Sequence, residues 1–371
     1  MTHCQRSTIL SIVATIAFAL LGPECSAGAG TNKPAAGLWV GGWVALSEYQ
    51  GRILRSGKGK NPNLAITGPE FSEAQSITFD QAQNLWFSYQ SDLSPFPQIV
   101  KLTSRQIAQI VNGEEVRTKV VLADLGTTGQ AMLGPDFITF DSSGSLWLAS
   151  SGANGIMEFL PAQIAVSGSP IPFISITSTD FNPGAVRFDR ANNLWVEQFV
   201  LTPPSPPTSA QIWMFAPSDR ASSGTANPSR KLDLPASFFP SDIAFDSGGN
   251  LWATGWTTNA NQSLLMKYSA ADLSGSGEIT PTPSVTISSI AFGEPSLTPC
   301  LGGLDFDAQG DLWASVQANQ VDCIGRSQII ELTPDQLQSS GNVIPSVTIG
   351  VIRVRKHQIL PGPLRFGPTA P

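Results

Sequence analysis

The sequence is poor in the side chains that most often carry out chemistry in proteins. Only 13% of its 371 residues are charged, and its two histidines are His3 and His357. It contains neither a Gly-x-Ser-x-Gly nucleophile motif nor a phosphate-binding loop. The net charge of −7 has the wrong sign for nucleic acid or an anionic membrane as the main partner. These absences leave few residues as candidates for a catalytic group.

Long apolar runs are also scarce, and the one that stands out lies at the N-terminus. It covers residues 9–21, follows Arg6 and ends at Gly22-Pro23. The run is short for a transmembrane helix, and the small residues at 26–27 are suited to cleavage. We therefore expect residues 1–27 to be a signal peptide and the mature protein to be secreted or periplasmic. We expect no transmembrane segment. Pro23 and Glu24 disfavour lipoprotein anchoring at Cys25.

Cysteine is nearly absent from the predicted mature chain. Removal of the signal peptide takes Cys4 and Cys25 with it and leaves Cys300 and Cys323. An even pair of cysteines in an exported protein predicts a disulfide bond. A metal site would need more ligands of this type nearby, and the sequence has no further cysteine near these two.

What the sequence has in abundance is a repeat. Glycine (34) and proline (29) are frequent, which indicates many turns and few helices. A Leu-Trp pair recurs with a period of about fifty to sixty residues, which is typical of β-propellers. The six pairs are Leu38-Trp39, Leu85-Trp86, Leu146-Trp147, Leu194-Trp195, Leu251-Trp252 and Leu312-Trp313.

Each repeat predicts four strands, which we call a to d. Strand a ends in Phe, an Asp and a short turn follow, and the Leu-Trp pair begins strand b. Strand c, a short helical turn and strand d complete the unit. The Asp side chain is suited to accept hydrogen bonds from the turn backbone. These aspartates are Asp80, Asp141, Asp189, Asp246 and Asp307. Three residues after each Asp the sequence has Gly or Asn, which tolerate positive φ, with Gln83 as the exception.

The first repeat lacks a strand a, and the end of the chain supplies a matching segment. Residues 363–366 (Pro-Leu-Arg-Phe) resemble residues 185–188 (Ala-Val-Arg-Phe). We therefore predict an all-β fold, a six-bladed propeller of four-stranded blades. In this fold the C-terminal strand joins the N-terminal blade and closes the ring. Residues 28–371 would form this single domain, and we expect a monomer.

The Phe-Asp-x-x-Gly-Asn-Leu-Trp-x-Ala pattern resembles secreted six-bladed propellers of the NHL-repeat, SMP-30/gluconolactonase and streptogramin-lyase groups. The resemblance to SMP-30-like lactonases implies a divalent metal, such as Ca²⁺, held by acidic and Asn side chains at the start of the inner strands. Only Asp136 matches that set. The resemblance to streptogramin lyases implies a catalytic histidine, and the only histidine of the mature chain is His357. A surface histidine is the alternative interpretation.

The predicted layout places the loops between strands d and a, and between b and c, on one face, which we call the top. Cys300 and Cys323 both fall in top loops of the sixth blade, as a disulfide requires. The top loops vary most in length, so a binding site is expected there, with solvated connectors as the alternative. Trp43 and Trp256 lie near this face, outside the Leu-Trp register. Each is suited either to stack on a sugar or other ring or to anchor a loop.

Charged residues that interrupt the repeat are the remaining site candidates. Glu197 stands where the other blades have a small side chain, and Arg187, Asp305 and Arg365 each precede a strand-a Phe. Asp242 lies in strand a before Phe245. We expect Glu197 to pair with Arg187, and Asp305 with Arg365. They would act either as ion pairs that line a wet channel or as ligand-binding residues.

Two functions follow from these features. The first is an exported scaffold that binds a small molecule, a carbohydrate or a protein at the top of the channel. No cofactor is firmly implied by this function. The alternative is a metal-dependent hydrolase or lyase that uses Asp136, Glu197 or His357.

Overall fold

The computed structural model describes most of the repeat region. The described residues are 36–42, 46–49, 64–66, 74–89, 98–111, 120–123, 137–200, 209–257, 262–288, 300–317, 328–350, 353–354, 357–358 and 361–368. They all belong to one compact unit, Pro34–Pro371. The predicted signal peptide lies outside the described residues. No helix in the described ranges has the length and apolar character needed to cross a membrane.

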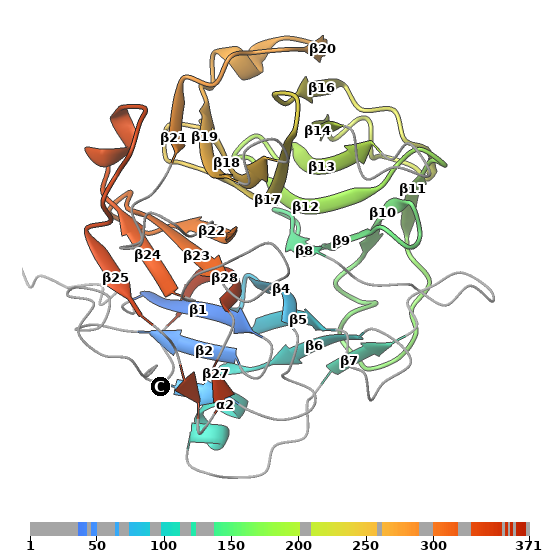
Figure 1. Cartoon of the computed structure of the whole chain (residues 1–371). Helices are drawn as coiled ribbons and strands as arrows, with labels where there is room; N and C mark the ends of the chain where they lie inside the picture. Colours follow the sequence, from blue (N-terminus) through green and yellow to red (C-terminus); the bar gives the residue numbers. More distant parts are fainter. Residues whose placement is uncertain are drawn as a thin grey trace, which may run out of the picture. The chain divides into compact units, whose positions relative to one another are not determined.

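The described residues form six antiparallel sheets of four strands, two of which gain a fifth, parallel strand (Figure 1). Three sheets contain, from the inner strand outward, β28 (Pro361–Pro368), β1 (Ala36–Gly42), β2 (Leu46–Tyr49), β3 (Leu64–Ile66); β4 (Ala74–Phe79), β5 (Leu85–Tyr89), β6 (Gln98–Leu102), β7 (Val120–Ala123); and β8 (Phe137–Phe140), β9 (Leu146–Ser150), β10 (Gly155–Phe159), β11 (Ile174–Thr177), β15 (Gly224–Thr225).

The other three sheets contain β12 (Pro183–Phe188), β13 (Leu194–Val200), β14 (Ser209–Phe215), β16 (Arg230–Asp233), β20 (Gly277–Ile279); β17 (Phe238–Phe245), β18 (Leu251–Thr257), β19 (Gln262–Tyr268), β21 (Val285–Ser288); and β22 (Cys300–Phe306), β23 (Leu312–Gln317), β24 (Gln328–Leu332), β25 (Val347–Ile349). A separate hairpin pairs β26 (Arg353–Val354) with β27 (His357–Gln358). Short helices α2 (Ser104–Val111), η2 (Asp272–Ser274) and η3 (Gln336–Gln338) follow third strands, where the sequence predicts helical turns.

The inner strands lie side by side around the centre of this unit. β4 contacts β28 and β8, β12 contacts β8 and β17, and β22 contacts β17 and β28. The protein is an all-β propeller, as the sequence predicts. The C-terminal strand β28 pairs with β1, with Leu38 opposite Phe366 and Trp39 opposite Arg365. That register repeats the pairing of β12 with β13, so the predicted partner of the C-terminal strand is correct.

The turn between each first and second strand is held by its Asp. The Oδ1 atom of Asp246 accepts hydrogen bonds from the backbone N–H groups of Gly248 and Asn250 at 2.9 and 3.0 Å. This confirms the predicted role of the Asp side chain. The Oδ2 atom accepts a further bond from Nε1 of Trp252 at 3.0 Å, which the sequence analysis did not foresee. The same indole bond forms from Trp86, Trp147, Trp195 and Trp313.

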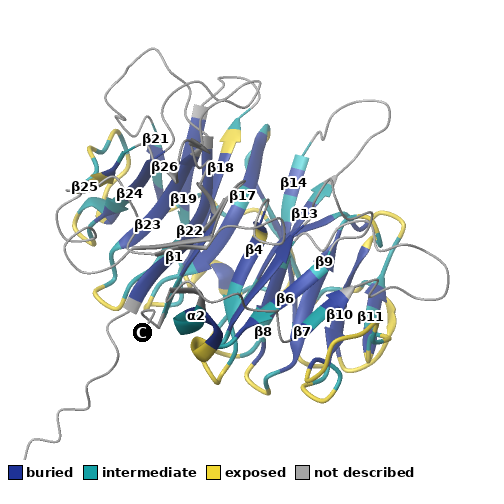
Figure 2. Cartoon of the chain, turned by 90° about the horizontal axis from the view of Figure 1, so that it is seen from below, coloured by how far each residue is buried: buried dark blue, intermediate teal, exposed yellow. Residues whose placement is uncertain are grey.

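Each Leu-Trp tryptophan is buried between two sheets. Its ring packs edge-on against the strand-a Phe of the next sheet, with ring centroids 5.6 to 6.2 Å apart. The pairs are Trp39–Phe79, Trp86–Phe140, Trp147–Phe188, Trp195–Phe245, Trp252–Phe306 and Trp313–Phe366. Figure 2 shows that buried residues follow the strands, whereas exposed residues gather in turns and connections. The repeat therefore builds the core between neighbouring sheets.

A second repeat, which the sequence analysis missed, covers the outer edges of four sheets. A Ser-Gly pair in the connection between strands c and d reaches back to strand d of the preceding sheet. Gly224 and Gly277 begin the short parallel strands β15 and β20, and Gly168 and Gly341 form single bridges. The preceding Ser accepts a backbone N–H of that edge strand at 3.0 Å in three cases: Ser167 from Val121, Ser223 from Ser175 and Ser340 from Thr286. We call these contacts edge latches. They occupy hydrogen-bonding groups that an open edge would expose.

Candidate functional site

A cluster of buried charges lies on the inner strands of consecutive sheets, and Asp242 of β17 is its centre. The Arg187 guanidinium of β12 donates from Nη2 to both Asp242 carboxylate oxygens, at 2.7 and 2.9 Å. Arg365 of β28 donates from Nη1 to the Asp242 Oδ2 atom at 3.2 Å. Asp242 is only 1% exposed. One carboxylate thus joins side chains from three sheets.

The predicted partners of these arginines are wrong. Arg187 was expected to pair with Glu197, and Arg365 with Asp305, but both guanidinium groups bind Asp242. Asp242 precedes Phe245 by three residues and Arg187 precedes its Phe by one, so alternation along the strand directs both side chains to the same face. Asp242 was a site candidate without an assigned partner, so the sequence did not predict that both arginines converge on it.

Asp242 and Asp305 also join neighbouring inner strands, which belong to different sheets and share no ladder. The Asp242 Oδ2 atom accepts the Leu304 N–H at 3.1 Å, and the Asp305 Oδ2 atom accepts the Phe366 N–H at 2.8 Å. Arg365 returns a bond from Nη1 to the Leu304 carbonyl oxygen at 3.1 Å. Side chains therefore bond β17 to β22, and β22 to the C-terminal strand.

Glu197 of β13 is enclosed next to this cluster and is 1% exposed. Its Oε2 atom accepts the Ala185 N–H at 3.1 Å, whereas its Oε1 atom has no hydrogen-bond partner. Burial and the charge of Asp242 raise its pKa to about 8, although the Ala185 bond and Arg187 oppose the rise. A Cβ atom on Gly184 would lie 2.9 Å from Oε2, so glycine makes room for this carboxyl group.

The other charged members are perturbed as well. Burial raises the pKa of Asp305 to about 6, and it raises the pKa of Asp242 despite the neighbouring Arg187. Arg365 is 8% exposed, and its buried Nη2 atom has no hydrogen-bond partner. The cluster therefore contains one buried donor group and one buried acceptor that are both unused.

Among the described residues, the inner-strand charges of this cluster lie on four consecutive strands, β12, β17, β22 and β28. At the positions that hold Arg187 and Asp305, β4 and β8 carry Thr78 and Thr139. At the position of Asp242, β4 carries Ser76, whose Oγ accepts the Ile138 N–H at 3.1 Å. The Ser76 bond shows that a neutral side chain is sufficient to join neighbouring inner strands.

Of the other predicted site residues, Trp256 has a described side chain. Trp256 of β18 is 41% exposed, and its ring lies against Phe239 with centroids 5.2 Å apart. Asp136, Cys323 and Trp43 lie outside the described residues. His357 and Cys300 are described by backbone position only, in β27 and β22. The disulfide bond therefore stays a prediction.

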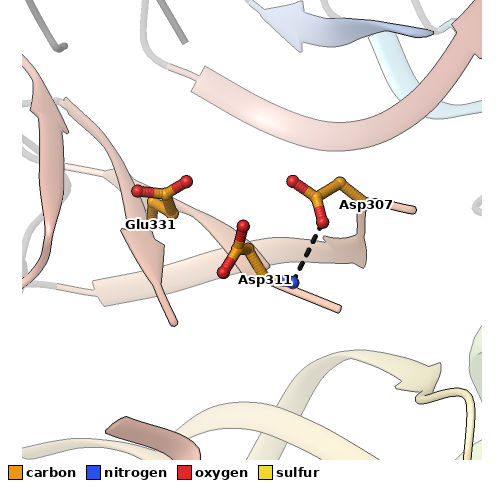
Figure 3. A group of neighbouring side chains, drawn as sticks. All are labelled: Asp307, Asp311 and Glu331. Atoms are coloured by element: carbon orange, nitrogen blue, oxygen red, sulfur yellow. Dashed lines mark hydrogen bonds between the residues drawn. The ribbon is translucent and has the colours of Figure 1, made fainter. Parts of the chain in front are cut away.

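A group of three carboxylates, absent from the predicted sites, lies where the turn between β22 and β23 meets β24 (Figure 3). Oxygen atoms of Asp307, Asp311 and Glu331 lie within 4.8 Å of one another. Burial and the neighbouring carboxylates raise the pKa values of Asp311 and Glu331. At the position of Glu331, β6 has Lys101, which pairs with Asp80 at 3.3 Å. The three carboxylates form a potential cation site at a turn, in a different sheet from Glu197.

Comparison with known proteins supports the fold alone. No family model matches the chain, and no curated protein matches its sequence. The chain is similar to a crystal structure of a protein of unknown function from Bacteroides caccae, with 14% identity and a TM-score of 0.51 over 90% of this chain and all of that one. It is also similar to a protein from Lactobacillus plantarum, with 10% identity and a TM-score of 0.50 over 81% and 80% of the two chains.

A weaker similarity is to the virginiamycin B lyase from Staphylococcus aureus. The identity is 14% and the TM-score 0.38, over 72% of this chain and 73% of that one. At this level the likeness carries no argument about activity.

Proposed function

We propose that this chain is an exported six-bladed propeller that binds a small polar molecule at the mouth of its central channel, above the charged cluster. The ring is closed by β28. Three features support that closure: the pairing of β28 with β1, the contacts of β28 with β22 and β4, and the packing of Trp313 on Phe366. The apolar run at residues 9–21 supports export.

The observation that carries the binding function is the incomplete satisfaction of the cluster. Buried ion pairs are often neutral or unfavourable for stability compared with apolar side chains of similar volume. An unused buried polar atom adds a cost of about 1–3 kcal/mol. Glu197 and Arg365 each have such an atom, while Ser76 performs the same strand-joining task without a charge. Buried groups of this kind are common where a protein binds or reacts.

The ligand that suits this cluster is small and polar, because the side chains of the cluster include both arginines and carboxyl groups. Trp256 is a partly exposed aromatic ring on β18, in the same sheet as Asp242. Such a ring is suited to stack on a sugar, so sugars are one chemical class of ligand that we propose. A protein partner at the same face is the other possibility within this function.

Thermal unfolding against a panel of probes tests the proposal. The panel contains neutral sugars, small carboxylates, sugar phosphates and small amines. We expect at least one probe to raise the Tm of the wild-type protein and of Arg105→Met, whose arginine is exposed on α2. The same probe should fail to stabilise Arg365→Met, or Arg365→Lys if the Met variant does not fold. A probe that stabilises all variants equally would place binding elsewhere, and no stabilising probe at all would refute the proposal.

A second function, an enzyme of the hydrolase or lyase class, is favoured by one observation. Glu197 holds its proton at neutral pH, because its pKa is raised to about 8, as a general acid requires. The metal-dependent form of this alternative has less support. Among the described residues, the carboxylates grouped closely enough to hold a cation are Asp307, Asp311 and Glu331. They lie in a different sheet from Glu197. Turnover of a lactone substrate that is abolished by chelator would overturn the binding function.

A further inference from the structure

The hydrogen bonds of the charged cluster leave one atom of Arg365 and one atom of Glu197 without a partner. In this arrangement Arg187 uses Nη2 for both Asp242 oxygens and Nη1 for the Val186 carbonyl oxygen. Arg365 reaches Asp242 with Nη1 alone. Its Nη2 atom and the Glu197 Oε1 atom are unused.

The unpaired Oε1 atom indicates the protonation state of Glu197. A carboxylate that is buried without a bonded cation is strongly unfavourable, so such a group stays neutral. The charged groups that act on Glu197 are Arg187 of β12 and Asp242 of β17. Arg187 is already bonded to Asp242, and Asp242 repels a second negative charge. A proton on Glu197 is therefore consistent with the geometry of the whole cluster.

We propose that loss of this proton moves Arg187 from Asp242 to Glu197, while Arg365 takes over Asp242 with both Nη1 and Nη2. The carboxyl O–H bond of Glu197 breaks, its electron pair stays on the oxygen, and the proton leaves to water. The new arrangement uses the two atoms that are now unused and leaves each arginine with a carboxylate partner. Paired contacts between arginine and carboxylate are among the strongest in proteins.

The exchange changes which strands are joined. In the present arrangement Asp242 joins β17 to both β12 and β28. After the exchange Arg187 would bond within its own sheet, and Asp242 would join β17 to the C-terminal strand alone. The cluster is thus a pH-sensitive switch on the inner strands. It requires no ligand, so it stands or falls independently of the proposed function.

Infrared spectroscopy of protein with ¹³C-labelled glutamate tests the switch. A protonated glutamate has a carbonyl band that disappears on ionisation, and we titrate this band from pH 5 to pH 10. We expect wild-type protein to lose a band with a midpoint near pH 8, in line with the raised pKa of Glu197. Glu197→Gln should lack that band. A wild-type protein without it at pH 6 would overturn the proposal.

Variants separate the exchange from simple ionisation. Arg365→Lys keeps the positive charge but cannot replace both contacts of Arg187 on Asp242, so the midpoint should rise by about one pH unit or more. Glu158→Gln, at a buried glutamate of another sheet, should leave the midpoint unchanged. If Arg365→Lys does not fold, Asp242→Asn should release Arg187 and lower the midpoint by a similar amount. An unchanged midpoint in whichever of these two variants folds would refute the exchange.

Discussion

The aspartate of the turn between first and second strands allows a sharp test, because one side chain accepts several of the hydrogen bonds that hold the hairpin. In Asp246 the Oδ1 atom accepts the N–H groups of Gly248 and Asn250, and the Oδ2 atom accepts Nε1 of Trp252. Asp246→Ala removes all of these acceptors. Trp252 is 1% exposed, so its indole N–H has little access to water as a replacement.

The expected loss of stability follows from these contacts. A hydrogen bond to a charged group contributes about 1.5–3 kcal/mol, and an unsatisfied buried donor costs about 1–3 kcal/mol. The backbone N–H groups of Gly248 and Asn250 lie at a turn and regain water, so the contributions do not simply add. We expect Asp246→Ala to lower the free energy of unfolding by roughly 3–5 kcal/mol. Asp246→Asn, which keeps one acceptor oxygen, should lose about half as much.

Urea unfolding followed by tryptophan fluorescence at pH 7 measures the difference. Asp180→Ala is the matched control, because Asp180 is exposed and its carboxylate accepts only a 3.5 Å bond from Thr179. It should change stability by less than about 0.5 kcal/mol. A loss below about 1 kcal/mol in Asp246→Ala would refute the idea that this carboxylate holds the buried indole.

The same variant has a defined pH dependence. Burial by itself raises the pKa of Asp246, but bonds from Trp252, Asn250 and Gly248 outweigh it, so the net pKa lies below the ordinary value of 3.8. The stabilisation is therefore present above pH 3.8 and is lost as the pH falls through the lowered pKa. The difference in the free energy of unfolding between wild type and Asp246→Ala should therefore become smaller as the pH falls through that range.

Three further predictions concern other parts of the fold. Glu197→Gln should be more stable than wild type at pH 9 by up to about 5 kcal/mol in urea unfolding. The reason is that a pKa raised from 4.5 to about 8 makes folding retain a proton, so wild-type stability falls as pH rises across that interval. A difference that persists at pH 4 would contradict this reason. Ser340→Ala should cost about 1 kcal/mol by removing the acceptor of the Thr286 N–H, whereas exposed Ser339→Ala should be neutral. Trp195→Ala should cost about 3–5 kcal/mol, because its ring is 2% exposed between two sheets.

The amino-acid sequence by itself determined the repeating unit, because each hairpin is local. Phe, Asp, a residue with positive φ and Leu-Trp lie within eight residues of one another in β17 and β18, so the pattern predicts the turn. Gln83 also adopts positive φ, at 61°, where the pattern alone made it an exception. The segment around Phe366 was identified by the same pattern, and its partner strand β1 is the predicted one.

Contacts between sheets were beyond the sequence, because they depend on which inner strands meet. Asp242 is 55 residues from Arg187 and 123 residues from Arg365. The repeat places all three on inner strands, but it does not determine which of them bond to one another. The edge latches had a sequence signal, the recurring Ser-Gly pairs. The structure was needed to show that each pair bonds to the edge strand of the preceding sheet. Burial likewise gave Glu197 its raised pKa. The local pattern thus determined the sheets, while the tertiary structure decided which charges meet among the inner strands.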